Sequence, residues 1–202
     1  AAAKKIYDRL VDLTPEDPQV YMLRGYIYDN EMDYDNALDD YTRAIELGVQ
    51  DPWLFNARGW VYTNLGDYAT AVADHESAIE LDPENADYYN NAAYSIAQGD
   101  GDLEKAMGYV EQALVLLPGA ESKRDTQGYI YYKMGENETA LEIFSALLEE
   151  GEYTYAYYGR GLVYQALGET ENAIGDFQAF LDAHPEVPES DDARQRIEDI
   201  GG

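Results

Sequence analysis

Cysteine is absent from this chain of 202 residues. Its absence excludes disulfide bonds, thiolate metal sites and cysteine nucleophiles, and it leaves the redox compartment open. Basic residues are few, because 13 Lys and Arg stand against 41 Asp and Glu and give a formal net charge of −28. So little positive charge argues against binding to nucleic-acid phosphates or to anionic membranes. The charge favours a basic partner, or else it serves only to keep an elongated protein soluble.

Long apolar runs are missing too, and none approaches the roughly 20 residues that a membrane-spanning helix needs. No signal peptide is recognisable at the start of the chain. The chain nevertheless begins inside a helical pattern, so we expect further sequence upstream, where a signal or a lipid anchor can lie. A secreted or envelope-anchored location is favoured over a cytoplasmic one.

The sequence does contain an internal repeat of small residues. One series consists of Gly25, Gly59, Ala93, Gly128 and Gly161. A second series follows about twelve positions later and consists of Ala37, Ala71, Ala106, Ala140 and Ala173, whose members are 33 to 35 residues apart. A period of about 34 residues with a helix–turn–helix pattern is typical of a stacked helical solenoid.

The stretch 52–85 shows the pattern within one repeat. Phe55, Gly59 and Tyr62 are spaced to share one face of a first helix. Pro83 closes the repeat, because proline cannot continue the second helix. This pattern resembles the tetratricopeptide repeat family, and five phased copies extend the resemblance over nearly the whole chain. The resemblance implies an all-α fold, a right-handed α–α superhelix.

The chain is predicted to form a single solenoid. Its expected parts are a half repeat at 1–17, five repeats at 18–51, 52–85, 86–120, 121–153 and 154–187, and a capping helix at 188–202. Ser190 is expected to cap that last helix. Solenoids need such a terminal capping helix for solubility. The half repeat lacks its first helix, so the face around Ile6 and Leu10 is expected to contact upstream sequence or to support self-association.

A pairing of charged residues becomes visible when the repeats are compared. Arg24, Arg58 and Arg160 each precede the key glycine, and sixteen residues later come Asp40, Asp74 and Asp176. The third and fourth repeats carry neither the Arg nor the Asp. Because the two residues are present together or absent together, we predict a structural ion pair between the two helices of these repeats, with a bidentate pair as its strong form.

No arrangement of residues points to catalysis. His75 lies where other repeats place Tyr41, Phe144 and Phe177, so we interpret it as a core residue, and His184 precedes a proline in a loop. Walker, HExxH and EF-hand spacings are absent. We therefore expect no catalytic residues, no metal site and no cofactor.

The resemblance also indicates a candidate binding surface, because first helices of the family line a concave groove that binds peptides or partner helices. At the facing positions this chain has aromatic and amide side chains: Tyr26, Asn30, Trp53, Asn56, Trp60, Asn64, Asn90, Tyr94, Gln98 and Tyr129. Aromatic side chains are favoured binding hot spots, and amides both donate and accept hydrogen bonds. An equally good interpretation is that the rings only pack neighbouring first helices together.

These observations predict a non-catalytic scaffold for protein–protein interaction. The family's carboxylate clamp for chaperone tails needs Lys, Arg and Asn at these positions, which are mostly aromatic, amide or acidic here, so a basic or apolar peptide fits better. Neither nucleic acid nor direct membrane insertion is expected. The alternative is a structural spacer or assembly module in a larger secreted or envelope protein; exposed groove rings favour the scaffold, and buried rings favour the spacer.

Overall fold

Residues 2–151 and 153–201, which the computed structural model describes, form twelve α-helices and no strand. The helices are α1 (Ala2–Leu13), α2 (Pro18–Asn30), α3 (Tyr34–Glu46), α4 (Pro52–Asn64), α5 (Tyr68–Leu81), α6 (Ala86–Gln98), α7 (Leu103–Leu116), α8 (Glu121–Met134), α9 (Asn137–Glu150), α10 (Ala156–Leu167), α11 (Thr170–Ala183) and α12 (Pro188–Gly201). They divide into two compact units, an N-terminal unit Ala1–Gly101 and a C-terminal unit Asp102–Gly202.

Helix ends follow from residues next to each helix. The side chains of Asp17, Asp51 and Asn85 accept hydrogen bonds from backbone N–H groups at the starts of α2, α4 and α6. Proline is the first residue of both α2 and α4, where its missing N–H costs nothing. Gly135 and Gly168 end α8 and α10 in the left-handed conformation, with φ of 80° and 76°.

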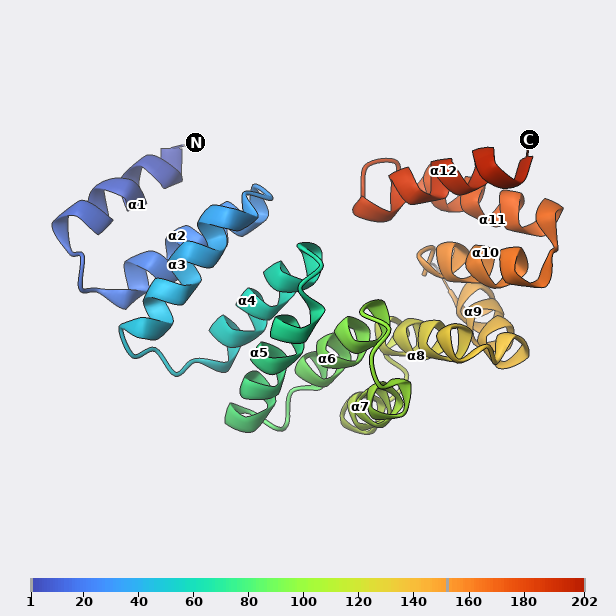
Figure 1. Ribbon diagram of the computed structural model, residues 1–202, viewed down its shortest axis with the longest axis horizontal. Coiled ribbons are helices and arrows are strands. Elements are labelled where there is room, and N and C mark those ends of the chain that lie inside the picture. The colour runs from blue at the N-terminus through green and yellow to red at the C-terminus, as the bar shows by residue number, and fades with distance from the viewer. Residues whose placement is uncertain (1, 152, 202) are drawn as a thin grey trace. The chain divides into compact units, whose positions relative to one another are not determined.

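In the N-terminal unit each helix packs on the next in sequence, and α4 also contacts the preceding and following first helices, α2 and α6 (Figure 1). The core between them contains Tyr41, Leu54 and Val61, all fully buried. A Cβ atom added to Gly25 would lie 2.7 Å from the ring of Tyr41. The small residue therefore allows α2 and α3 to approach closely.

The C-terminal unit repeats this arrangement, with α8 packed on α9, α9 on α10, α10 on α11 and α11 on α12 (Figure 1). Phe144 and Leu147 fill its core beside α10, and Phe177, Phe180 and Ala193 fill the core that α12 covers. The all-α fold of antiparallel helix pairs predicted from the repeats is thus confirmed in both units.

The expected role of Ser190 is wrong. The last helix begins at Pro188, so Ser190 lies inside its first turn and is buried. Its hydroxyl donates to the carbonyl of His184 at 2.6 Å and accepts from the N–H of Val187 at 3.1 Å. The side chain holds the loop before α12 instead of capping the helix.

Two long apolar side chains of α1, Ile6 and Leu13, are 60% and 66% exposed, whereas Leu10 packs against the core of the N-terminal unit. Self-association through this edge stays a prediction. Among the described residues, no helix combines the length and the apolar character that a membrane crossing requires.

Candidate functional site

The predicted ion pairs lie at hydrogen-bond distance in all three repeats. Arg24 Nε donates to Asp40 Oδ2 at 2.7 Å and Nη2 to Oδ1 at 2.8 Å. The same two contacts measure 2.7 and 2.7 Å for Arg58 with Asp74, and 2.7 and 2.8 Å for Arg160 with Asp176. All three aspartates are buried. Each pair is therefore a bidentate clamp between the first and second helix of its repeat.

The remaining nitrogen of each guanidinium makes a contact that the comparison of repeats did not predict. Nη1 of Arg24 reaches Asp8 on α1 at 3.1 Å, and Nη1 of Arg58 reaches Thr42 on α3 at 3.2 Å. In both cases the acceptor lies sixteen residues before the arginine, a spacing that could have revealed it. Nη1 of Arg160 lies 3.5 Å from the hydroxyl of Ser145 on α9, fifteen residues before it. The arginines thus also link their repeat to the helix that precedes it.

Exposed aromatic rings lie on the first helices of the N-terminal unit. Tyr26, Trp53 and Trp60 are 49%, 37% and 40% exposed, while Tyr94 is half-buried. The ring centroids of Tyr26 and Trp53 are 5.8 Å apart, and those of Trp60 and Tyr94 are 6.2 Å apart. These rings therefore pack across neighbouring first helices and still present apolar surface to solvent.

Three amide side chains of the predicted binding surface, those of Asn30, Asn64 and Gln98, donate hydrogen bonds to groups of their own helices. The amide nitrogen of Asn30 donates to the carbonyl of Tyr26 at 2.6 Å, and that of Asn64 to the carbonyl of Trp60 at 2.8 Å. Gln98 donates to the hydroxyl of Tyr94 at 2.7 Å. Tyr26, Trp60 and Tyr94 are thus each joined to an amide one helical turn further on.

Asn56, another amide of the predicted binding surface, belongs to a polar network around His75. Asn56 Oδ1 lies 3.0 Å from His75 Nδ1 and accepts from the amide of Asn91 at 3.0 Å. Asn56 is thereby engaged inside the unit. His75 is fully buried, and burial lowers its pKa to about 4, so the ring is neutral at physiological pH. The buried atoms His75 Nε2 and Asn90 Oδ1 have no hydrogen-bond partner.

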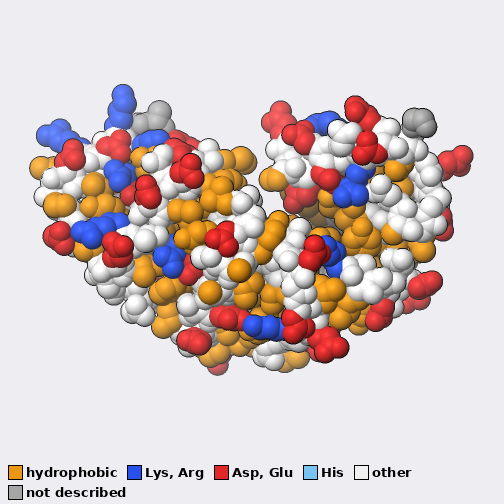
Figure 2. Space-filling view, in the orientation of Figure 1, with side chains coloured by type: hydrophobic (Ala, Val, Ile, Leu, Met, Phe, Trp, Pro, Cys, Tyr) orange, Lys and Arg blue, Asp and Glu red, His pale blue; other side chains and the backbone are white. Residues whose placement is uncertain are grey.

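The first helices of the C-terminal unit present tyrosines together with charged groups. Tyr129 packs against Tyr132, with ring centroids 6.1 Å apart. The hydroxyl of Tyr158 donates to Asp192 at 2.7 Å, and Arg196 joins the same carboxylate and also donates to Gln165. This network ties α12 to α10. Figure 2 shows Asp and Glu side chains spread over the visible surface of each unit, as the net charge demands.

Within the part of the chain that the structure describes, no group of three or more His, Cys, Asp or Glu side chains is placed to hold a metal ion. His184 lies in the loop before α12, where its Nε2 is 2.8 Å from the hydroxyl of Thr154 and its ring stacks on Tyr155. Both histidines are thus held by packing and hydrogen bonds.

Models of one family match three stretches of the chain. A model described as TPR repeat matches residues 59–98, and two described as tetratricopeptide repeat match residues 18–47 and 126–188. The chain belongs to the tetratricopeptide repeat family. The resemblance predicted from the spacing of small residues is therefore confirmed, and the fold is that of a scaffold for protein–protein interaction.

Solved structures agree with this fold. A tetratricopeptide repeat protein from Parabacteroides merdae has a TM-score of 0.82 at 18% identity, with 100% of this chain and 77% of that chain covered. YrrB, described as a TPR protein with an unusual peptide-binding site, has a TM-score of 0.61 at 21% identity over 94% and 97% of the two chains. A chain of the APC/C Cut9–Hcn1 hetero-tetramer has a TM-score of 0.78 at 16% identity over 96% of this chain and 38% of that chain. No curated protein matches the chain.

Proposed function

We propose that this tetratricopeptide repeat protein binds an extended peptide or a partner helix on the exposed face of its first helices. The observation that carries the proposal is the exposure of Tyr26, Trp53 and Trp60 on a face where neighbouring rings already hold each other in place. Rings fixed in this way give contact area at little entropic cost. YrrB, whose description names a peptide-binding site, supports this use of the fold.

The amides beside the rings suit the polar part of such a ligand. Because the amide nitrogens of Asn30 and Asn64 donate to carbonyls of their own helices, their oxygens are the groups that face a partner's N–H donors. The net charge of −28 attracts a basic partner, and its association rate is expected to fall as salt rises.

The experiment is selection of peptides from a random display library on the whole protein, followed by affinity measurement with Trp60→Ala and Tyr94→Ala variants. We expect Trp60→Ala to weaken a selected peptide by about 2 kcal/mol, roughly thirtyfold, with unchanged helical circular dichroism. Val115→Ala is the matched control, since Val115 is 72% exposed on the second helix α7. If a variant with both Trp60→Ala and Tyr94→Ala binds a selected peptide as tightly as the natural chain does, the binding site lies elsewhere.

The second candidate is a spacer or assembly module, and the ring contacts Tyr26–Trp53 and Trp60–Tyr94 favour it. In that case the rings only join neighbouring first helices. The same experiment separates the two functions, because a spacer yields no selected peptides and loses thermal stability when Trp60 is truncated.

A further inference from the structure

The indole N–H groups of Trp53 and Trp60 are hydrogen-bond donors that the fold leaves without an acceptor. Within residues 2–151 and 153–201, the hydrogen bonds of both tryptophans involve only their backbone atoms. Both residues are exposed. Tryptophan at a binding surface combines an apolar ring with a polar N–H that needs a partner, so these two donors are available to a ligand.

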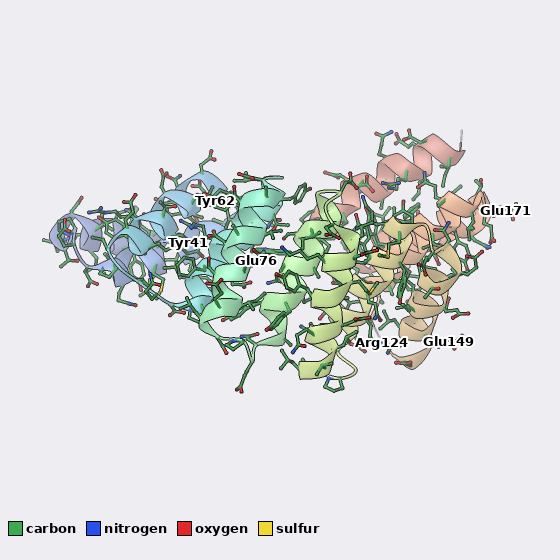
Figure 3. All side chains as sticks on the ribbon, turned by 60° about the horizontal axis from the view of Figure 1, so that its bottom comes forward. Tyr41, Tyr62, Glu76, Arg124, Glu149 and Glu171 are labelled. Carbon is green, nitrogen blue, oxygen red and sulfur yellow. The ribbon has the colours of Figure 1, made fainter. Side chains whose placement is uncertain are left out.

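Neighbouring rings hold both indoles in position. Trp53 packs against Tyr26, and it also meets the fully buried Tyr41 of α3, labelled in Figure 3, with ring centroids 6.1 Å apart and ring planes at 90°. Trp60 packs against Tyr94 with an angle of 33° between the ring planes. Because the rings are already ordered, a ligand that packs on them does not have to immobilise them.

The spacing of the two tryptophans restricts the conformation of the ligand. Trp53 and Trp60 are seven residues apart on α4, which puts them on one side of that helix and about 10 Å apart along its axis. In a polyproline II helix, residues three apart return to the same side after about 9 Å. In a β-strand, residues on one side are about 7 or 13 Å apart, because alternate residues face the same way. The spacing therefore fits a polyproline II segment better than a β-strand.

The free donors decide between a polyproline II segment and an α-helix, because an α-helix also places residues about 10 Å apart on one face. Carbonyl groups inside an α-helix already accept hydrogen bonds from its own N–H groups. A polyproline II backbone has no internal hydrogen bonds, so its carbonyls can accept from the indoles of Trp53 and Trp60. The side-chain oxygens of Asn30 and Asn64 can accept from N–H groups of the residues between the prolines.

We propose that the ligand of this face is a polyproline II segment with two prolines three residues apart, one on the ring of Trp53 and one on the ring of Trp60. The proposal rests on the proposed peptide-binding function and names the class of ligand. Such a segment has its bound conformation before it binds, so it loses less entropy than a flexible chain. The net charge of −28 favours Lys or Arg beside the prolines.

The test titrates the whole protein with two peptides of equal composition, KAPAAPAK and KAPAPAAK, both acetylated and amidated. The chain has two tryptophans, so its two indole N–H signals in NMR spectra report on this face alone, and Trp60→Phe assigns them. We expect saturable shifts of both signals with KAPAAPAK. Binding of KAPAPAAK should be about fivefold weaker, because only one of its prolines can reach a tryptophan at a time.

Substitutions in the protein test the donor itself. Trp60→Phe keeps an aromatic ring but removes the N–H, so it should weaken KAPAAPAK roughly fivefold with unchanged helical circular dichroism. Tyr155→Phe is the matched control, because it removes a donor from an exposed ring of the C-terminal unit. Equal binding of the two peptides, no effect of Trp60→Phe, or equal weakening by Tyr155→Phe would overturn the proposal.

Peptide selection distinguishes this failure from failure of the proposed function. Selected peptides that depend on Trp60 but lack two prolines at this spacing refute the polyproline II ligand and leave the peptide-binding function in place. A library that yields no peptide, together with no response to KAPAAPAK, contradicts both proposals.

Discussion

Single backbone positions differ between otherwise equivalent turns. The turn between the two helices of a repeat has a residue with positive φ. This residue is glycine at Gly66, Gly135 and Gly168, but Met32 in the first repeat and Asp100 in the third, with φ of 57° and 52°. A side chain in this conformation costs about 1 kcal/mol, and Met32 is 63% exposed, so its removal loses little packing. Met32→Gly is therefore expected to raise the free energy of unfolding by up to about 1 kcal/mol in urea denaturation. Gly66→Met should lower it by a similar amount, and a gain in that variant would contradict this account.

The arginine clamps differ in energy from ordinary surface pairs. Arg58 is 16% exposed and Asp74 only 6%, so truncating the arginine leaves a buried carboxylate without its partner. Arg58→Ala is expected to lower the free energy of unfolding by about 2 kcal/mol or more. Arg43→Ala, which removes an exposed arginine paired with Glu46, is the control and should have no measurable effect. Equal losses in the two variants would show that burial of the pair contributes nothing.

At the scale of helices, the closest approach between the two helices of a repeat depends on a glycine that faces an aromatic ring. A Cβ atom at Gly161 would lie 2.7 Å from the ring of Phe177, so Gly161→Ala forces α10 and α11 apart. We expect a loss of about 1–3 kcal/mol in the free energy of unfolding. Gly175→Ala on α11 meets no atom within 4 Å, and its better helix propensity should instead stabilise the protein by up to about 1 kcal/mol. Thermal unfolding of both variants checks the opposite signs.

The repeat spacing predicted the helix pairs because the packing that sets it is local and recurs. Comparison of the repeats also located the arginine clamps. It contained one further pattern, a compensation of residue size between the two helices of a repeat. The third repeat has Ala93 where others have glycine, and Val110 where they have a ring, so a larger first residue accompanies a smaller second one. Ser190 was misplaced because the path of the preceding loop, and not the helix sequence, determines its hydrogen bonds. The raised pKa of Asp125 was equally beyond prediction, since the charge of Glu189 on α12 adds to the effect of burial.

At the scale of the whole molecule, the two units are expected to respond to acid in opposite directions. His75 in the N-terminal unit has its pKa lowered from 6.5 to about 4 by burial, so acidification below pH 6.5 protonates the unfolded chain first and destabilises that unit. Asp125 in the C-terminal unit has its pKa raised from 3.8 to about 7, first by burial. Its contribution to stability is fully present below pH 3.8 and is lost as the pH rises through 7. Acidification from pH 7 therefore stabilises the C-terminal unit.

Between pH 7 and pH 5 each effect amounts to roughly 2 kcal/mol, from 1.36 kcal/mol per pKa unit. Hydrogen exchange read by mass spectrometry, corrected for the intrinsic pH dependence of exchange, reports protection in each unit separately. We expect protection at pH 5 to fall in α4 and α5 and to rise in α8 and α10. His75→Phe, which copies the ring of the fourth and fifth repeats, should abolish only the first change, and Asp125→Asn only the second. Parallel changes in both units of the natural chain would mean that other groups dominate the pH response, because these two residues act with opposite sign.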